Sequence, residues 1–262
     1  MRHLAYILTA VLAWGTAPGA RAADWQSLPA SAYKMKDMTA SLPLPAAPAA
    51  EKGRRLVCID PGHPNSYSNG LTQINGTNET RINWQVALKL EQTLKEKGFD
   101  VVITKNAELQ SVENKERALI CNRSGATLAV HLHCETTPGS GYALYYPDRE
   151  GTFNYNNDPD IGYKGPTPPV IAGSRLLAQA VQTGMRAKLA GLLNDLGIKG
   201  DSHTQVGANQ GALTFSIFSQ IPTLTIEMAV LTNKHDAAFI KSPEGQQKMA
   251  QAIASGIQLS AR

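Results

Sequence analysis

The chain alternates short apolar runs with longer segments in which apolar residues recur at every fourth position. Leu56–Ile59 is an apolar, partly β-branched run that ends at Asp-Pro-Gly, the pattern of a buried strand that enters a turn. Apolar residues at intervals of four then run from Ile82 to Leu94, the stripe of a helix. By the same reasoning, the expected strands lie at 56–59, 99–104, 127–133, 141–146 and 222–230, and the expected helices at 79–98, 111–123, 171–196 and 236–257.

This order of elements predicts a single α/β domain with a central, mostly parallel (mixed) sheet and helices on both faces. Two segments fit the pattern less simply. The expected helix 171–196 contains Gly184 and Gly191, which weaken a helix. Residues 147–169 are rich in Pro, Gly, Asn, Asp and Tyr and are longer than most connections, which favours a functional or mobile loop.

The N-terminal part of the chain has a different character. Residues 1–22 combine a short polar start, an apolar stretch from Leu4 to Trp14 and an A-x-A site at 20–22, which predicts a secretory signal peptide. The apolar stretch is shorter than a membrane anchor needs. Residues 23–53 are dominated by Ala and Pro and are expected to form an extended arm or linker before a folded domain at 54–262.

Charge and cysteine content narrow the picture further. The net charge is +4, and +2 once Arg2 and Arg21 of the signal segment are set aside, which is too small to argue for a nucleic-acid partner. Export makes disulfides relevant. With three cysteines, Cys58, Cys121 and Cys134, at least one stays unpaired within the chain. One disulfide is compatible with the sequence, which does not choose the pair.

Candidate metal-binding and acid–base side chains follow the expected strands. His63 comes just after the first strand, and Glu79 opens the next helix, which begins at the same edge of the sheet. His131 and His133 end the third strand and point to one side, because alternate strand residues share a face. Glu227 lies in an apolar strand, where a carboxylate is costly unless it is paired, protonated or near a metal. Two histidines and one carboxylate are a common catalytic zinc set, with a further carboxylate as general base.

Spacing alone does not rank His131 against His133. Each residue taken singly also has a structural interpretation. A lone loop histidine is more often a hydrogen-bonding residue than a ligand, and Glu79 suits the dipole of a first helical turn.

Four motifs occur in order along this α/β pattern. They are Val57-Cys-Ile-Asp-Pro-Gly-His63, then Glu79 with Asn83, then Glu116-Arg117-Ala118 with Asn122 and Gly125-Ala-Thr-Leu-Ala-Val-His131, and finally Thr225-Ile-Glu227-Met-Ala-Val-Leu-Thr-Asn233. Together they resemble the zinc-dependent N-acetylmuramoyl-L-alanine amidases of the amidase 3 type, and the resemblance covers about Arg54 to the C-terminus.

The resemblance implies that His63, Glu79 and His131 bind Zn²⁺ and that Glu227 is the catalytic glutamate. His131 is preferred over His133 because it takes the place of the histidine in the family's Ser-Ile-His-Ala-Asn motif. The implied reaction cleaves the amide between the lactyl group of N-acetylmuramic acid and the L-alanine of the stem peptide. Zinc-activated water would attack, and Glu227 would serve as general base and then as general acid.

The resemblance also has departures and leaves alternatives. Pro64 and Asn65 follow the Asp-Pro-Gly-His motif where the family usually has Gly, and His133 stands in place of the motif's Asn.

The resemblance implies that residues 54–262 are the catalytic domain and that its partner is peptidoglycan or muropeptides. Whether a protein activator is needed is left open. We expect export to the periplasm, with secretion beyond it left open and no membrane span after signal removal. The alternatives are an exported zinc peptidase or other amidohydrolase, or a non-catalytic peptidoglycan-binding protein.

Overall fold

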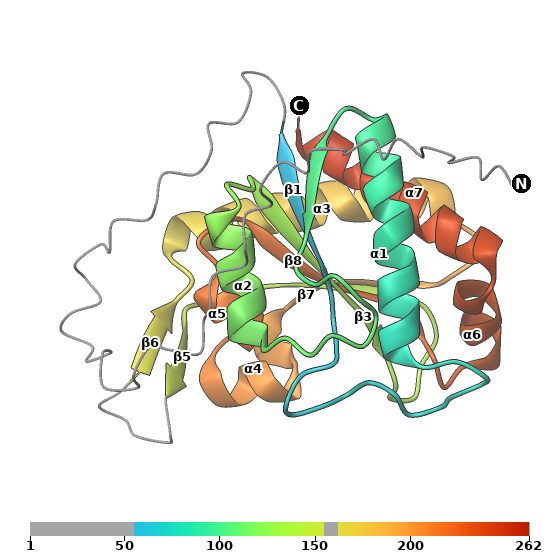
Figure 1. The fold of residues 1–262 in the computed structure, drawn as a ribbon, viewed down its shortest axis with the longest axis horizontal. Helices are drawn as coiled ribbons and strands as arrows, with labels where there is room; N and C mark the ends of the chain where they lie inside the picture. Colours follow the sequence, from blue (N-terminus) through green and yellow to red (C-terminus); the bar gives the residue numbers. More distant parts are fainter. Residues whose placement is uncertain (1–54, 155–161, 262) are drawn as a thin grey trace, which may run out of the picture. The chain divides into compact units, whose positions relative to one another are not determined.

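The fold is described by a computed structural model for residues 55–154 and 162–261 (Figure 1). The expected signal peptide at 1–22 and the expected arm at 23–53 lie outside the described residues. None of the helices in the described part of the chain has both the length and the apolar character of a transmembrane span.

Six strands form the central sheet in the order β2-β1-β3-β8-β4-β7. The first four in this order run parallel. β4 is antiparallel to β8, and β7 is parallel to β4. The prediction of a mostly parallel, mixed sheet is therefore confirmed. The strands are β1 Leu56–Pro61, β2 Asp100–Ile103, β3 Leu128–Glu135, β4 Tyr142–Tyr146, β7 Asp195–Gly200 and β8 Thr223–Val230.

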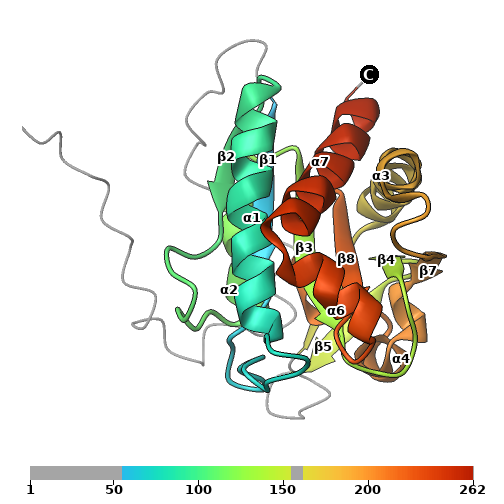
Figure 2. The same cartoon turned by 90° about the vertical axis from the view of Figure 1, so that its right-hand side faces the viewer.

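Helices cover both faces of this sheet, as predicted. α1, α7 and α3 lie side by side over one face, with α7 between the other two (Figure 2). α2 and α5 pack over the other face, where Cys58 and Ala129 meet Phe215. The helices are α1 Glu79–Glu96, α2 Asn114–Arg123, α3 Pro168–Leu189, α4 Gln205–Gln210, α5 Thr214–Phe218, α6 Lys234–Lys241 and α7 Pro243–Ser260, with a 3-10 turn, η5, at Asp201–His203.

α1 illustrates how the sequence specifies these elements. Its start is fixed by Asn78, whose side chain accepts a hydrogen bond from the backbone N–H of Arg81 in the first turn. The apolar stripe from Ile82 to Leu94 is at most 1% exposed. Each buried aliphatic side chain of this kind contributes about 1.5–3 kcal/mol, so the stripe fixes which side of α1 faces the sheet.

The prediction of a helix through 171–196 is wrong beyond residue 189. α3 ends at Leu189, and Gly191 follows with a φ of 76°, a left-handed conformation that breaks the helix. Leu196, which the prediction placed in this helix, belongs instead to β7, a strand that was not predicted. Its pattern is hidden because β7 is a short edge strand whose alternation is interrupted by Gly197, at a φ of 87°.

Gly184 has a packing role inside α3. A Cβ atom at this position would collide with the backbone of Gly256 on α7, so the two helices approach more closely than larger residues permit. The glycine that weakens the helix locally therefore stabilises the contact between helices.

The segment 147–169 is not only a connecting loop. It contains a separate antiparallel pair, β5 Gly151–Asn154 and β6 Gly162–Gly165. The expectation of a loop is wrong for these two short strands, and residues 155–161 between them lie outside the described part of the chain.

Candidate functional site

β1 ends in a buried carboxylate, Asp60, that three side chains hold. Arg117 Nη1 donates to Asp60 Oδ1 at 2.8 Å, and Thr104 donates to the same oxygen. His131 Nδ1 donates to the other oxygen, Oδ2. Burial alone would raise the pKa of the Asp60 carboxyl, but Arg117 and His131 hold this pKa well below its ordinary value. Asp60 is therefore a charged group that ties α2 and β3 to the end of β1.

Two buried cations hold the loop that follows β1. Arg117 also donates to the carbonyl oxygens of Pro61 at 2.7 Å and Pro64 at 2.9 Å. Lys105 Nζ donates to the carbonyl oxygen of His63, and burial lowers the pKa of Lys105 to about 8. His63 has a φ of 59°, a conformation that residues with a Cβ rarely adopt. The carbonyl contacts on both sides keep His63 in this conformation.

Glu79 reaches the same place from the first turn of α1. Its Oε1 atom is 2.6 Å from His133 Nδ1 and accepts a hydrogen bond from the backbone N–H of Cys134 at 3.2 Å. Its Oε2 atom is 3.2 Å from His63 Nε2. The cap at Asn78 sets where α1 begins, and so it sets where this carboxylate points.

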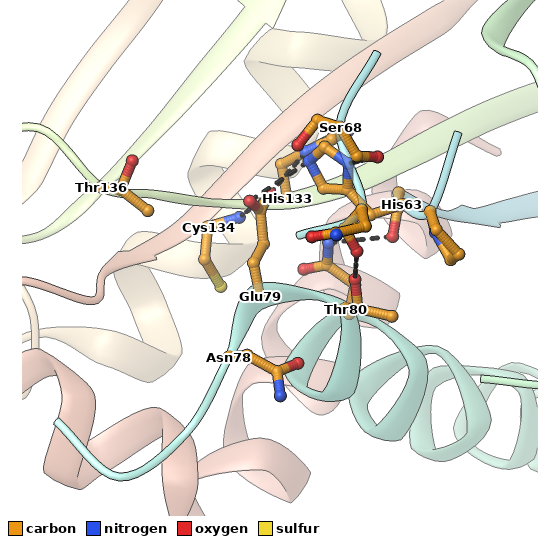
Figure 3. A network of polar contacts seen from close by, with 12 residues as sticks. His63, Ser68, Asn78, Glu79, Thr80, His133, Cys134 and Thr136 are labelled. Carbon is orange, nitrogen blue, oxygen red and sulfur yellow. Dashed lines mark hydrogen bonds and ion pairs between the residues drawn. The ribbon is translucent and has the colours of Figure 1, made fainter. Parts of the chain in front are cut away.

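His63, Glu79 and His133 form one cluster, in which a ligand atom from each lies within 4.8 Å of the other two (Figure 3). His63 Nδ1 lies 3.2 Å from the carbonyl oxygen of Ser68 and can donate to it, which leaves Nε2 facing the cluster. All three side chains are half-buried. Imidazole nitrogens and a carboxylate at this spacing are suited to a transition metal such as zinc.

The electrostatics of Glu79 and His133 favour the protonation states that a metal needs, whereas His63 is held toward its charged form by Glu79. Burial opposes the charge on Glu79, but His133 and His63 lower the pKa of its carboxyl. Burial and the neighbouring His131 lower the pKa of His133 to about 4, so this ring is neutral near pH 7. Burial would also lower the pKa of His63, but Glu79 outweighs it and raises that pKa. A charged carboxylate and neutral imidazole are the ligand forms that bind metal.

His131 lies directly beside this cluster and contacts it through His133. The two Nε2 atoms are 2.8 Å apart. The other nitrogen of His131 bonds to Asp60, and its ring stacks on Phe215 with centroids 4.7 Å apart. The structure thus brings the predicted residues His63 and Glu79 together with His133, and it places His131 between His133 and the buried Asp60.

Glu227 lies opposite His133 in the β3–β8 pairing, so both side chains are on the same face of the sheet. It is half-buried, and its Oε2 atom is shielded from solvent and has no hydrogen-bond partner among the residues that the structure describes. Burial, then the carboxylates of Glu79 and Glu135, raise the pKa of Glu227 well above its ordinary value. A carboxyl group that is readily protonated and has a free oxygen is suited to proton transfer.

Gly62 sets how closely the loop after β1 approaches β3. A Cβ atom on Gly62 would collide with the His133 ring and with the carbonyl oxygen of Leu132. The carbonyl oxygen of Gly62 accepts a hydrogen bond from Asn83 Nδ2 at 3.2 Å, which ties the loop to α1. The glycine of the Asp-Pro-Gly-His motif therefore makes room for a histidine from another strand.

The roles of Asp60, Arg117 and Lys105 were not predicted from the sequence. Asp60 and Arg117 lie inside the recognised motifs, which were the available signal, but nothing in their spacing showed that they pair. Lys105 gave no signal, because a lysine after a strand is usually solvent-exposed. The cysteine question is resolved by a disulfide between Cys58 on β1 and Cys121 on α2.

Comparisons with known proteins place this geometry in a family. The Amidase_3 family model, described as N-acetylmuramoyl-L-alanine amidase, matches residues 57–259. The N-acetylmuramoyl-L-alanine amidase AmiA of Escherichia coli is 24% identical over 233 residues, which cover 80% of this chain and 78% of AmiA.

Solved structures show the same fold. The N-acetylmuramoyl-L-alanine amidase AmiC2 of Nostoc punctiforme has a TM-score of 0.61 at 23% identity, and the match covers 79% of this chain and 97% of that one. The CwlD amidase from Clostridioides difficile, in complex with the GerS lipoprotein, has a TM-score of 0.58 at 20% identity over 79% and 98% of the two chains. With the family match over residues 57–259, these findings show that the chain belongs to the Amidase_3 family of N-acetylmuramoyl-L-alanine amidases, enzymes that hydrolyse the amide between N-acetylmuramic acid and L-alanine in peptidoglycan.

Proposed function

We propose that this amidase is zinc-dependent and that His63, Glu79 and His133 hold the metal. The observation that carries the proposal is the cluster of three ligand atoms within 4.8 Å of one another. The donor set of two imidazoles and one carboxylate fits zinc and leaves a coordination position open, as catalytic zinc sites do. His133 takes the place that the resemblance gave to His131, because His131 is already bonded to Asp60.

His131 then acts as a positioning residue. Its Nδ1–H is donated to the charged Asp60, so its Nε2 is an acceptor for the Nε2–H of His133. This arrangement leaves Nδ1 of His133 for the metal, on the side where Glu79 lies. Hydrogen bonds of this kind fix the tautomer and orientation of metal-binding histidines.

Glu227 is proposed as the group that moves protons during hydrolysis. When bound, zinc supplies a water of lowered pKa and polarises the amide carbonyl. Glu227 Oε2, which has no hydrogen-bond partner within residues 55–154 and 162–261, accepts the proton of the attacking water. The same carboxyl then donates that proton to the alanine nitrogen as the amide bond breaks. The position of Glu227 opposite His133 supports this role.

Analysis of the reaction products tests the proposed function. Purified protein is incubated with muropeptides, with and without a chelator, and the products are identified by mass spectrometry. We expect stem peptides with an intact N-terminal alanine, and no release once zinc is removed. Cleavage within the stem peptide would instead identify a peptidase, and full activity without metal would refute zinc dependence.

We also propose that the protein is exported to the periplasm after removal of residues 1–22. The A-x-A site supports this, and so does the Cys58–Cys121 disulfide, because disulfides persist in oxidising compartments. Residues 23–53 would then form an N-terminal arm. N-terminal sequencing of the protein recovered from cell fractions tests both points. A mature protein in the cytoplasm that begins at residue 1 or 2 would refute them.

An activating protein partner is a further part of the proposal. The C. difficile CwlD amidase, which shares this fold, was solved in complex with the GerS lipoprotein. If the purified chain binds zinc but turns over muropeptides slowly, addition of an extract from the cell envelope should raise its rate. An unchanged rate, with a fast reaction by the protein alone, would argue against an activator.

A further inference from the structure

The loop between β1 and α1 is uncharged and carries one exposed aromatic side chain. From Pro64 to Asn78 the sequence contains no Asp, Glu, Lys, Arg or His, and most of its exposed positions are Ser, Asn, Thr or Gln. Tyr67, near the start of this loop, is 87% exposed. The loop thus surrounds an aromatic ring with hydroxyl and amide groups, which suits a neutral, polar ligand better than a charged one.

The tip of this loop is held in place by hydrogen bonds. Asn65 Oδ1 accepts from the backbone N–H groups of Tyr67 at 3.0 Å and Ser68 at 2.9 Å. Ser66 donates to Glu113 from its backbone N–H and from its hydroxyl group, both at 2.8 Å. The backbone that carries Tyr67 therefore loses little freedom when a ligand binds, which favours affinity.

The tip also lies beside the metal cluster. The carbonyl oxygen of Ser68, the residue after Tyr67, is 3.2 Å from His63 Nδ1 (Figure 3). The hydroxyl group of Thr80 donates to the carbonyl oxygen of Asn69 at 2.6 Å, which ties the loop to the first turn of α1. Tyr67 is therefore an exposed aromatic residue on the rim of the candidate active site.

The order of the strands indicates which half of the substrate faces this rim. β3 lies between β1 and β8, so the ligand His133 separates the loop after β1 from Glu227 on β8. Glu227 is proposed to protonate the alanine nitrogen, so the peptide half of the amide lies on the β8 side. The acyl half, which is the lactyl group with its sugar, then extends toward the β1 side, where Tyr67 lies.

We propose that Tyr67 stacks on the pyranose ring of N-acetylmuramic acid and that the loop from Pro64 to Asn78 is the sugar-binding side of the active site. This inference rests on the proposed amidase function and adds the part of the enzyme that recognises the sugar. A pyranose ring presents a face of C–H groups that packs on an aromatic ring, and its hydroxyl and N-acetyl groups are uncharged hydrogen-bonding groups. Tyr67 makes the enzyme prefer a peptide attached to the sugar over the same peptide attached to a lactyl group alone.

Kinetics on two synthetic substrates test the inference. One is an N-acetylmuramoyl peptide, and the other is the lactyl peptide of the same sequence, which has the same cleaved amide but no sugar. We expect Tyr67→Ala to raise KM for the N-acetylmuramoyl peptide about 3–10-fold, the size of one aromatic stacking contact. KM for the lactyl peptide should stay at its native value, because that substrate has no ring to stack. Tyr67→Phe keeps the aromatic ring and should retain the native KM for both.

A matched control truncates an exposed side chain far from the cluster. Leu176 on α3 is 66% exposed and lies near Leu128 and Pro222, where β3 and β8 begin, at the opposite edge of the sheet. Leu176→Ala should change neither KM. Zinc content and thermal unfolding of Tyr67→Ala should match those of the native protein, because the truncated side chain is exposed.

The outcomes separate this inference from the proposed function. An unchanged KM for the N-acetylmuramoyl peptide in Tyr67→Ala would overturn the inference and leave the amidase function intact. An equal rise in KM for both substrates would also overturn it, since Tyr67 would then contact the peptide or the lactyl group. Turnover of neither substrate by the native enzyme would overturn the proposed function and this inference with it.

Discussion

Replacing His131 and His133 separately by asparagine gives the sharpest test of the proposed metal site. The two residues are two positions apart on one strand, point to the same face and contact each other. Only His133 belongs to the cluster whose ligand atoms lie within 4.8 Å of one another. His133→Asn removes one of three ligands, and we expect stoichiometric zinc binding to be lost.

His131→Asn should have a smaller effect of a different kind. Asp60 keeps its bonds from Arg117 and Thr104, so the buried carboxylate stays neutralised. The substitution removes His131 Nε2, the hydrogen-bond acceptor that orients the His133 ring. Loss of such a supporting hydrogen bond typically weakens metal affinity 10–100-fold, or about 1.4–2.7 kcal/mol. Zinc should still bind at one equivalent, but more weakly.

The assay is competition for zinc with a chromophoric chelator, together with metal content and thermal unfolding of each variant. His235→Asn, at an exposed site, serves as the matched control and should bind zinc like the native protein. If His131→Asn abolishes zinc binding while His133→Asn keeps it, His131 is the ligand and the interpretation given above is wrong.

Three further outcomes follow from the site. Glu227→Gln should keep one equivalent of zinc but lower kcat by about 10²–10⁴-fold, and a near-normal rate would exclude it as the proton-transfer group. Arg117→Met leaves Asp60 buried without its main partner and should lower the free energy of unfolding by about 3–5 kcal/mol, measured by urea denaturation. Since the pKa of Asp60 is lowered by folding, its contribution is complete above its unfolded pKa of about 4 and is lost as pH falls, so the native protein and Arg117→Met should converge in stability in acid. Cys121→Ser opens a loop of 63 residues and should cost about 4 kcal/mol, and an unchanged denaturation midpoint would show that the disulfide does not form in solution.

The sequence was sufficient to predict the elements that carry the candidate site. The strand before His63 and the helix after Asn78 have strong apolar periodicity and clear end signals, and both form where expected. β7 was missed because an edge strand buries little, so its sequence carries only a weak pattern. Apolar periodicity in a sequence arises because one face of an element is buried. Short edge strands bury little surface, so their periodicity is weak.

The choice between His131 and His133 could not be made from periodicity. Both residues satisfy the same alternation, and the feature that distinguishes them is the carboxylate each one meets. His131 meets Asp60 and His133 meets Glu79, and those pairings depend on how β1 and α1 are placed in three dimensions. The family resemblance favoured His131, the geometry of the cluster favours His133, and the zinc affinities of the two asparagine variants decide between them.

Gly62 shows that the dimensions of this site depend on a residue that has no side chain. The loop after β1 approaches β3 only because nothing extends from residue 62, where even one methyl group would overlap the His133 ring. The separation between His63 and His133 is therefore set by a residue with no chemistry of its own. A relative that keeps every ligand and acid but carries a larger residue here would have the ingredients of the centre without its spacing, so an inventory of reactive side chains alone is an incomplete criterion of activity.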